Sequence, residues 1–179
     1  LFKVRGSVAN VGNDTSPYQL VQTFSVPGQG YLGLTTLNSP STRLNPDLKP
    51  ENIESTEVGL ELSLLDNNLT FDFAYYNITT TDMIFRVPVP AATGYSFFLE
   101  NVGEVTNQGV ELLLGYNIIN NSDMRWNSSL FASKNENKLV SLIDDLDTLV
   151  YYQTNSGNVN SQAKVGGGIG DLYGTVWER

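Results

Sequence analysis

The sequence predicts an all-β fold in which antiparallel strands are joined alternately by short turns and long polar loops. Charged residues make up only 16% of the 179 residues and aromatic residues 11%, a composition that suits strands better than helices. Apolar and polar residues alternate along several segments, as in strands with one apolar face. Turns of about three to four residues alternate with loops of roughly twenty to forty, an asymmetry typical of barrels that cross a membrane.

The composition argues against several classes of function. Lys and Arg number 10 and Asp and Glu 19, so the net charge is -9 and a nucleic-acid backbone would be repelled. Because cysteine and histidine are absent, we expect no disulfide, no thiol or imidazole catalysis, no zinc site and no cofactor. No run of about 18 apolar residues occurs and Leu1 opens into strand-like sequence, so we expect neither a membrane helix nor a signal peptide.

The first strand is expected over Phe2–Gly12, where apolar residues alternate with Lys3, Arg5 and other small or polar residues. A polar loop of about forty residues, Asn13–Ile53, follows and is far longer than a hairpin loop. It ends in L-N-P-D-L-K-P-E, Leu44–Glu51, whose two prolines restrict φ and remove N–H donors. We therefore expect this stretch to be extended and outside any central ladder.

A hairpin is predicted next. Glu54–Leu65 alternates apolar residues with Glu, Gly and Ser, so one face is lipid-like and the other wet. Asp66–Asn68 is a tight turn, because Asn and Asp tolerate the left-handed conformation that a short hairpin demands. Leu69–Tyr76 then forms the returning strand, which we expect to continue through Thr79–Arg86 until Pro88 ends it.

The second half of the chain repeats this arrangement. A long loop is expected over about Val87–Glu104, and Asn101–Ile119 leads from that loop into a strand with apolar residues at alternate positions. Asn120–Asp123 is another short polar turn, and Met124–Leu142 forms a strand whose faces the pattern does not assign. From Ile143 onward the pattern weakens into a tail rich in Gly, Asn and Ser.

Two architectures fit these strands. In an outer-membrane barrel, the short turns would lie in the periplasm and the long loops outside, and Tyr116 and Trp126 would belong to an aromatic girdle. A soluble β-sandwich that binds glycans also has alternating strands, but it does not require alternation of loop lengths. The pattern alone leaves both open.

Ordered motifs favour the barrel. Asn101, Gly103, Asn107, Gly109 and Glu111 form N-x-G-x-x-x-N-x-G-x-E at the start of a strand, which resembles a signature of the SusC/RagA-like TonB-dependent transporters of the bacterial outer membrane. The strings N-P-D-L-K-P-E, S-T-E-V-G-L-E-L, L-T-F-D-F-A-Y-Y-N and S-K-N-E-N-K-L-V resemble the same family in the same order, as does the opening V-R-G-S-V-A-N-V-G-N-D-T. As a set, the motifs are specific and cover about residues 2–142.

The resemblance implies an antiparallel transmembrane β-barrel segment with long extracellular loops, about five strands of a larger barrel. A plugged barrel needs about 22 strands, so we expect residues 1–179 to be part of a barrel domain without its plug domain. The resemblance further implies a protein of the outer membrane that is not an enzyme and that imports an oligosaccharide or peptide. The implied partners are outer-membrane lipid, a SusD-like surface lipoprotein, TonB acting through the plug, and the glycan or peptide substrate.

Two groups of residues are candidates for contact with substrate or partners. The acidic residues on the polar strand faces would face the barrel lumen, where they guide a substrate, contact a plug or are merely solvated: Glu57, Glu61, Asp72 and Glu111. Aromatic residues of the outer loops would stack on sugars, pack on a partner lipoprotein or pack within the loops: Tyr31, Tyr95, Phe97, Phe98, Tyr151 and Tyr152.

Two other roles for acidic residues find less support. Paired carboxylates can hydrolyse glycosidic bonds, but nothing in the sequence shows two acids converging on a cleft. Asp144, Asp145 and Asp147 offer oxygen ligands for calcium, yet their spacing lacks the glycine and distal Glu of an EF-hand loop. This pattern favours a solvated acidic loop.

Overall fold

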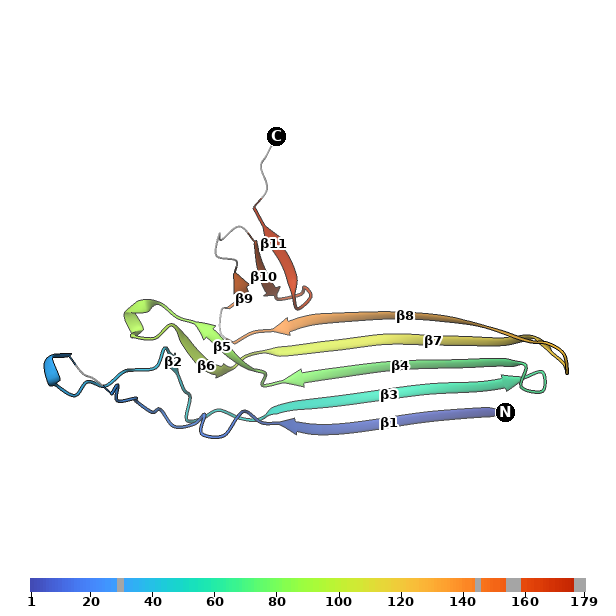
Figure 1. The fold of residues 1–179 in the computed structure, drawn as a ribbon, viewed down its shortest axis with the longest axis horizontal. Helices are drawn as coiled ribbons and strands as arrows, with labels where there is room; N and C mark the ends of the chain where they lie inside the picture. The colour runs from blue at the N-terminus through green and yellow to red at the C-terminus, as the bar shows by residue number, and fades with distance from the viewer. Residues whose placement is uncertain (29–30, 144–145, 154–158, 176–179) are drawn as a thin grey trace.

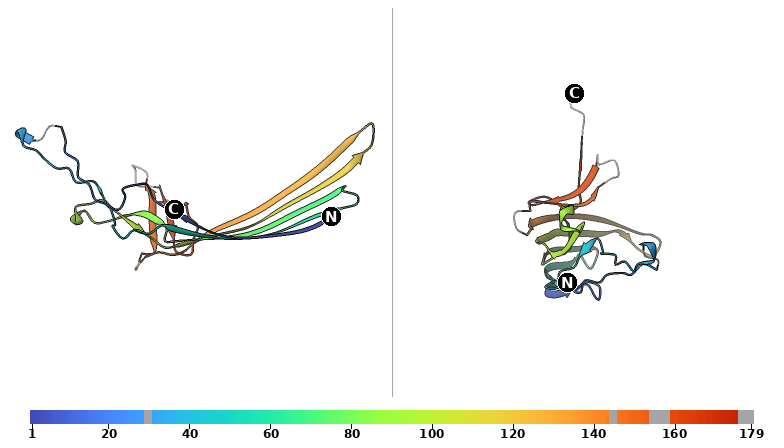
Figure 2. Two further views of the ribbon diagram at one scale, coloured as in Figure 1. Left: turned by 90° about the horizontal axis from the view of Figure 1, so that it is seen from below. Right: turned by 90° about the vertical axis from the view of Figure 1, so that its left-hand side faces the viewer.

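A computed structural model describes residues 1–28, 31–143, 146–153 and 159–175. Its largest element is a sheet of five long strands in which every neighbouring pair is antiparallel. In spatial order they are β1 (Phe2–Asn13), β3 (Glu51–Leu64), β4 (Leu69–Thr81), β7 (Glu104–Asn120) and β8 (Arg125–Ser141). Figure 1 shows these strands side by side, and Figure 2 shows that the sheet curves along its length. The five predicted strands are confirmed.

The short turns lie together at one end of this sheet. The β3–β4 turn spans residues 65–68 and the β7–β8 turn residues 121–124, both at the end where the N-terminus lies (Figure 1). Leu65, Asp66 and Asn67 have positive φ, which explains the run of Asp and Asn in that turn. The long connections, 14–50 and 82–103, leave from the opposite end. The predicted alternation of turns and loops is therefore confirmed.

The register of the strands gathers their apolar residues on one side of the sheet. One cross-strand row comprises Phe2, Leu62, Phe71, Leu114 and Leu130, and the second comprises Val4, Leu60, Phe73, Leu112 and Ala132. Because alternate side chains point to opposite faces, the two rows share one face, called here the apolar face. The register also settles the faces of β8, whose even-numbered residues from Ser128 to Lys138 lie on the apolar face.

No second layer covers the apolar face in the described part of the chain. Val58 is 50% exposed, Leu114 37% and Leu130 61%. A β-sandwich would bury these side chains against a second sheet. The open face therefore contradicts the soluble sandwich and is the surface that a barrel turns towards lipid.

One strand boundary was predicted wrongly. The strand that begins at Leu69 ends at Thr81 rather than running through Thr79–Arg86. Asp82 has a φ of 54°, a left-handed conformation that cannot continue a strand. The chain turns there, and β5 (Ile84–Pro88) pairs instead with β6 (Phe97–Asn101) in a separate hairpin.

This hairpin belongs to a small sheet in which β2 (Thr42–Arg43) pairs with β6 in parallel. Phe97 and Phe98 are therefore strand residues and not part of an irregular loop. A 3-10 turn, η2 (Ala91–Thr93), joins β5 to β6, and a second, η1 (Tyr31–Gly33), lies in the first long connection. Neither of these helical segments, among the described residues, has the length and hydropathy needed to cross a membrane.

The tail forms a third sheet that the sequence did not predict, made of β9 (Thr148–Gln153), β10 (Val159–Lys164) and β11 (Asp171–Gly174). It lies at the loop end of β8 (Figure 1). A buried cluster of Val102, Leu139, Leu149 and Ala163 joins it to the long strands. The main apolar core of the described residues therefore lies at the loop end and not within the five-stranded sheet.

The motif residue Asn101 ties the proline-containing segment to the end of the sheet. Its Nδ2 donates to the carbonyl oxygens of Lys49 at 2.8 Å and Asp82 at 2.7 Å, and its Oδ1 accepts from the Lys49 N–H at 2.8 Å. Asn45 Nδ2 adds a bond of 2.7 Å to Glu100 Oε2. These bonds hold the proline-containing segment outside the five-stranded sheet, which is what we expected from its two prolines.

The two glycines of the motif, Gly103 and Gly109, lie where neighbouring atoms leave no room for a Cβ. At Gly103, φ is +70° and a Cβ would collide with the Ser141 carbonyl oxygen. At Gly109 a Cβ would lie 2.5 Å from the Tyr76 hydroxyl oxygen. That hydroxyl accepts from Asn135 Nδ2 at 2.8 Å, and the same amide donates to Asn107 Oδ1 at 2.6 Å. The motif therefore has a structural basis in cross-strand packing.

A pair of adjacent substitutions tests which face lies in lipid. Leu112→Arg places a charge on the apolar face, and this should lower the free energy of unfolding by about 2–4 kcal/mol if that face lies near the middle of a bilayer. Leu113→Arg, one residue along and on the opposite face, should cost much less. The measurement is denaturant unfolding of the full-length protein in phospholipid vesicles. Equal losses for the two variants would contradict the assignment of the faces.

A second substitution tests the role of Asn101. Asn101→Ala removes three hydrogen bonds, and the loss of even one net bond of about 1 kcal/mol would raise amide exchange at Lys49 about fivefold. The measurement is hydrogen–deuterium exchange of the peptide that contains Lys49. Asn120→Ala is the matched control, because its exposed side chain bonds to none of the described residues. Unchanged exchange at Lys49 would show that Asn101 does not hold this segment.

Candidate functional site

The face opposite the apolar face carries a cluster of charged side chains. Arg5 donates from Nη1 to Glu61 Oε1 at 2.7 Å and from Nη2 to Asp72 Oδ1 at 3.0 Å. Its Nε lies 3.7 Å from Glu57 Oε1, and Lys3 Nζ lies 3.0 Å from Glu61 Oε1. Three of the acidic residues singled out from the sequence therefore converge on two cations of β1.

Small residues make room for the long side chain of Arg5. Arg5 pairs with Gly59 on β3, and Gly59 pairs with Ala74 on β4. A Cβ at Gly59 would lie 2.5 Å from Arg5 Nε, so the arginine crosses its neighbouring strand only because that position is glycine. This crossing brings the guanidinium from β1 to Asp72 on β4.

The charged cluster affects the electrostatic potential of this face more than the stability of the fold. The side chains of Arg5 and Glu61 are each 32% exposed, Asp72 40% and Glu57 47%. Ion pairs this exposed contribute only about 0–1 kcal/mol each. All four carboxylates of the prediction lie on this face, where acidic residues outnumber basic ones, so the face, called here the polar face, is acidic.

Glu111 lies on the polar face without joining the cluster. It pairs in register with Ala74 and Ser133, and it forms no ion pair with any described residue. A hollow of about 480 Å³ lies between it and Arg5, lined also by Glu57 and Tyr76. The structure therefore places all four predicted carboxylates on one face, where they can meet a polar solute.

The predicted aromatic residues divide into two kinds. The Phe98 ring lies under Arg43 Cζ at 5.0 Å and meets Tyr95 edge to face at 6.1 Å, so these two rings pack within the loop region. Phe97 is 39% exposed and lines a groove of about 540 Å³ together with Arg86 and Leu99. Of the three predicted aromatic residues whose side chains the structure describes, Phe97 is thus the one with a ring available to a ligand or partner.

Several predicted residues fall outside the described part of the structure. These are Asp144 and Asp145, and the side chains of Tyr31, Tyr151 and Tyr152. Asp147 is described and exposed, and its carbonyl oxygen accepts from the Val165 N–H at 3.0 Å. Among the described residues, no group of three or more potential ligands is placed to hold a metal ion.

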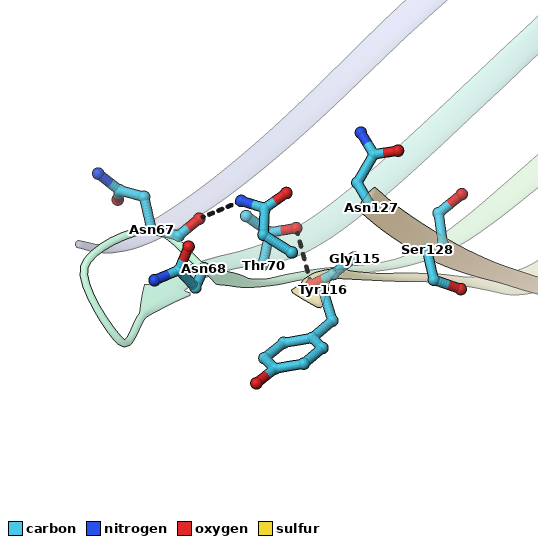
Figure 3. A pocket seen from close by; sticks show the side chains of 9 residues that line it. Asn67, Asn68, Thr70, Gly115, Tyr116, Asn127 and Ser128 are labelled. Atoms are coloured by element: carbon cyan, nitrogen blue, oxygen red, sulfur yellow. Dashed lines mark hydrogen bonds between the residues drawn. The ribbon is translucent and has the colours of Figure 1, made fainter. Parts of the chain in front are cut away.

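A second polar hollow, which the sequence analysis missed, lies at the turn end of the sheet (Figure 3). Its volume is about 200 Å³, and its lining is amide, hydroxyl, glycine and one aromatic side chain: Asn67, Asn68, Thr70, Gly115, Tyr116, Asn117, Asn127, Ser128 and Ser129. Thr70 Oγ1 donates to the Gly115 carbonyl oxygen and Asn117 Nδ2 to that of Asn67, both at 3.4 Å. With no charged group in its lining, this hollow offers hydrogen bonds rather than ionic contacts.

Sequence comparison places the chain among known proteins. Residues 2–175 match the family model described as TonB dependent receptor-like, beta-barrel. TonB-dependent receptor P3 of Formosa agariphila is 34% identical over 154 residues, which cover 83% of this chain and 15% of the relative. TonB-dependent receptor SusC of Bacteroides thetaiotaomicron is 24% identical over 172 residues, which cover 92% of this chain and 17% of SusC.

Comparison with solved structures points to the same family. The structure of the RagAB peptide transporter superposes with a TM-score of 0.78 at 26% identity, covering 93% of this chain and 18% of that chain. The RagAB peptide importer in its open-open state gives a TM-score of 0.74 with the same coverage. This chain therefore spans less than a fifth of the length of these relatives. The family match over residues 2–175 and the division of the sheet into an apolar and a polar face show that the chain belongs to the TonB-dependent receptor β-barrel family of the bacterial outer membrane.

Proposed function

We propose that this chain is part of the wall of a TonB-dependent transporter that imports a nutrient, such as an oligosaccharide or a peptide, through a plugged barrel. The observation that carries this proposal is the single-layer sheet with cross-strand apolar rows on one face and a charged cluster on the other. A wall between lipid and an aqueous lumen requires this division. The proposal assigns no catalytic role to the chain.

In this proposal lipid covers the apolar face, and Glu57, Glu61, Asp72 and Glu111 face the lumen. The edges of β1 and β8 carry no further strand among the described residues. Unpaired edges of this length are avoided within a membrane, so neighbouring strands of a larger barrel domain would pair with them. The plug, and the TonB contact that moves it, would be supplied by other regions of the protein.

The charges of the polar face bear on the substrate class. The excess of carboxylates over cations on the polar face would disfavour an anionic solute beside this part of the wall. A neutral oligosaccharide or a peptide without excess negative charge fits this surface, and the similar RagAB transporter is a peptide importer. At the loop end, the exposed ring of Phe97 would contact the substrate or a SusD-like surface lipoprotein.

The lipid-facing and lumen-facing assignments can be tested with single cysteines, because this chain contains none. Ala132 and Ser133 are adjacent exposed residues of β8 on opposite faces, and both differ little from cysteine in size. In proteoliposomes of the full-length protein, Ser133→Cys should react with a hydrophilic maleimide at least about tenfold faster than Ala132→Cys, since lipid would exclude the reagent from the apolar face. Equal reaction rates would refute a membrane wall.

The transport function itself is tested by growth. Cells with and without the intact gene are supplied with either a peptide mixture or a neutral oligosaccharide mixture as the sole carbon source, each with and without functional TonB. Growth on one of the two mixtures should require both the gene and TonB. If loss of the gene affects growth on neither mixture, the proposed substrate classes are wrong.

A further inference from the structure

The free edge of β8 is closed at its loop end by a turn of the tail sheet. The Leu139 N–H donates to the Gly167 carbonyl oxygen at 2.9 Å, and the Leu139 carbonyl oxygen accepts from the Gly166 N–H at 2.8 Å. The side chain of Asn137 adds a third bond, because its Oδ1 accepts from the Ile169 N–H at 2.7 Å. The turn that joins β10 to β11 therefore pairs with β8 much as the end of another strand would.

Glycine allows this turn, residues 165–170 and called here the glycine turn, to approach β8 closely. Gly166 has a φ of +87°, a backbone conformation that other residues rarely adopt. A Cβ at Gly168 would lie 3.2 Å from Asn137 Oδ1, which is tighter than most Cβ contacts. The Leu139 side chain is also buried in the core cluster of the loop end. Backbone bonds and apolar packing therefore fix the glycine turn against the end of β8.

The bonds of Leu139 also show which backbone groups of β8 point away from β7. In an antiparallel sheet, successive residues of a strand turn their N–H and C=O groups alternately to the neighbour on one side and on the other. The β7–β8 register is unbroken from Leu139 back to Asn127, so the odd-numbered residues share the direction of Leu139. At the turn end, the Asn117 N–H donates to the Asn68 carbonyl oxygen on the β4 side at 2.8 Å. Its partner Asn127 therefore also points away from β7, in agreement with the bonds of Leu139.

The outward-facing backbone groups of residues 127–135 have no such partner among the described residues. They flank Leu130 and Ala132, whose side chains lie on the apolar face that the proposed function places in lipid. Unbonded N–H and C=O groups are avoided within a membrane, and another strand presents matching groups at the same spacing. This stretch extends over about 31 Å at 3.4 Å per residue, or about 23 Å along the membrane normal at a tilt of about 40°. Its length therefore fits the roughly 25 Å apolar band of outer-membrane barrels.

We propose that the edge of β8 has two partners: a further strand of the same protein pairs with residues 127–135, and the glycine turn takes the place of that strand from Asn137 onwards. The inference rests on the proposed membrane wall, because the strand belongs to the larger barrel domain. This chain covers less than a fifth of the length of its relatives, so the strand is assigned to the same protein and not to a second copy. It leaves the sheet before Leu139, where both backbone groups already have partners. The wall is thus continued by a strand within the membrane and by the tail sheet beyond it.

The test is hydrogen–deuterium exchange of the full-length protein in non-ionic detergent, measured at single residues of β8. In the native protein the amides of Ser133, Asn135 and Leu139 should all be protected. Asn137→Ala removes the bond to the Ile169 N–H, and the loss of one such bond should raise exchange at Leu139 about fivefold. Exchange at Ser133 should stay unchanged, because the further strand and not the glycine turn holds that amide.

Asn135→Ala is the matched control. Asn135 lies on the same face of β8 as Asn137 and two residues before it, and its amide donates to Tyr76 and Asn107 instead of contacting the glycine turn. Its removal should leave exchange at Leu139 unchanged.

Three results would overturn the inference. Unchanged exchange at Leu139 in Asn137→Ala would show that the glycine turn does not close this edge. Rapid exchange at Ser133 in the native protein would show that no strand pairs there, and protection that disappears when the protein is diluted would assign the strand to a second copy. The Ala132 and Ser133 labelling experiment separates this inference from the membrane wall. If Ala132→Cys stays protected while the exchange results fail, only the assignment of the edge is wrong, and if Ala132→Cys is labelled freely, the wall is wrong as well.

Discussion

In-register antiparallel pairing of five long strands is the constraint on which the rest of this structure depends. Pairing satisfies the backbone hydrogen bonds between neighbours, and the period of two then sends alternate side chains to opposite faces. Between the bulges at the two ends of the β7–β8 pairing, the register is continuous across all five strands. Their apolar residues therefore coincide in rows. A sheet with one apolar face and no covering layer is stable only where lipid replaces that layer.

The polar face follows from the same register. Arg5 reaches Asp72 across an intervening strand because Gly59 leaves the space for it. Charges that would be costly on the lipid side are tolerated here, where water and opposite charges surround them. In the proposed barrel, the apolar face would set the position of the wall in the membrane, and the polar face would be the electrostatic surface that a solute meets.

The loop end is organised by a different kind of interaction. Long polar connections cannot bury enough apolar surface alone, and here they share one small core around Val102, Leu139 and Leu149. The Asn101 side chain then binds the backbone of Lys49 and of Asp82, which lie 52 and 19 positions before it in the sequence. In a family whose loops meet the exterior, such fixed points explain how a chain so rich in Asn, Ser and Gly keeps its loops in place.

The sequence by itself determined the five long strands, the two short turns and the shared face of Glu57, Glu61, Asp72 and Glu111, because alternation and turn chemistry are local properties. Only the tertiary structure decided the faces of β8, the end of β4 at Asp82, the sheet β9–β11 and the partners of Arg5. Arg5 and Asp72 are 67 positions apart, and two successive strand pairings bring them together. Register between distant strands arises from long-range packing, and no local period in the chain records it.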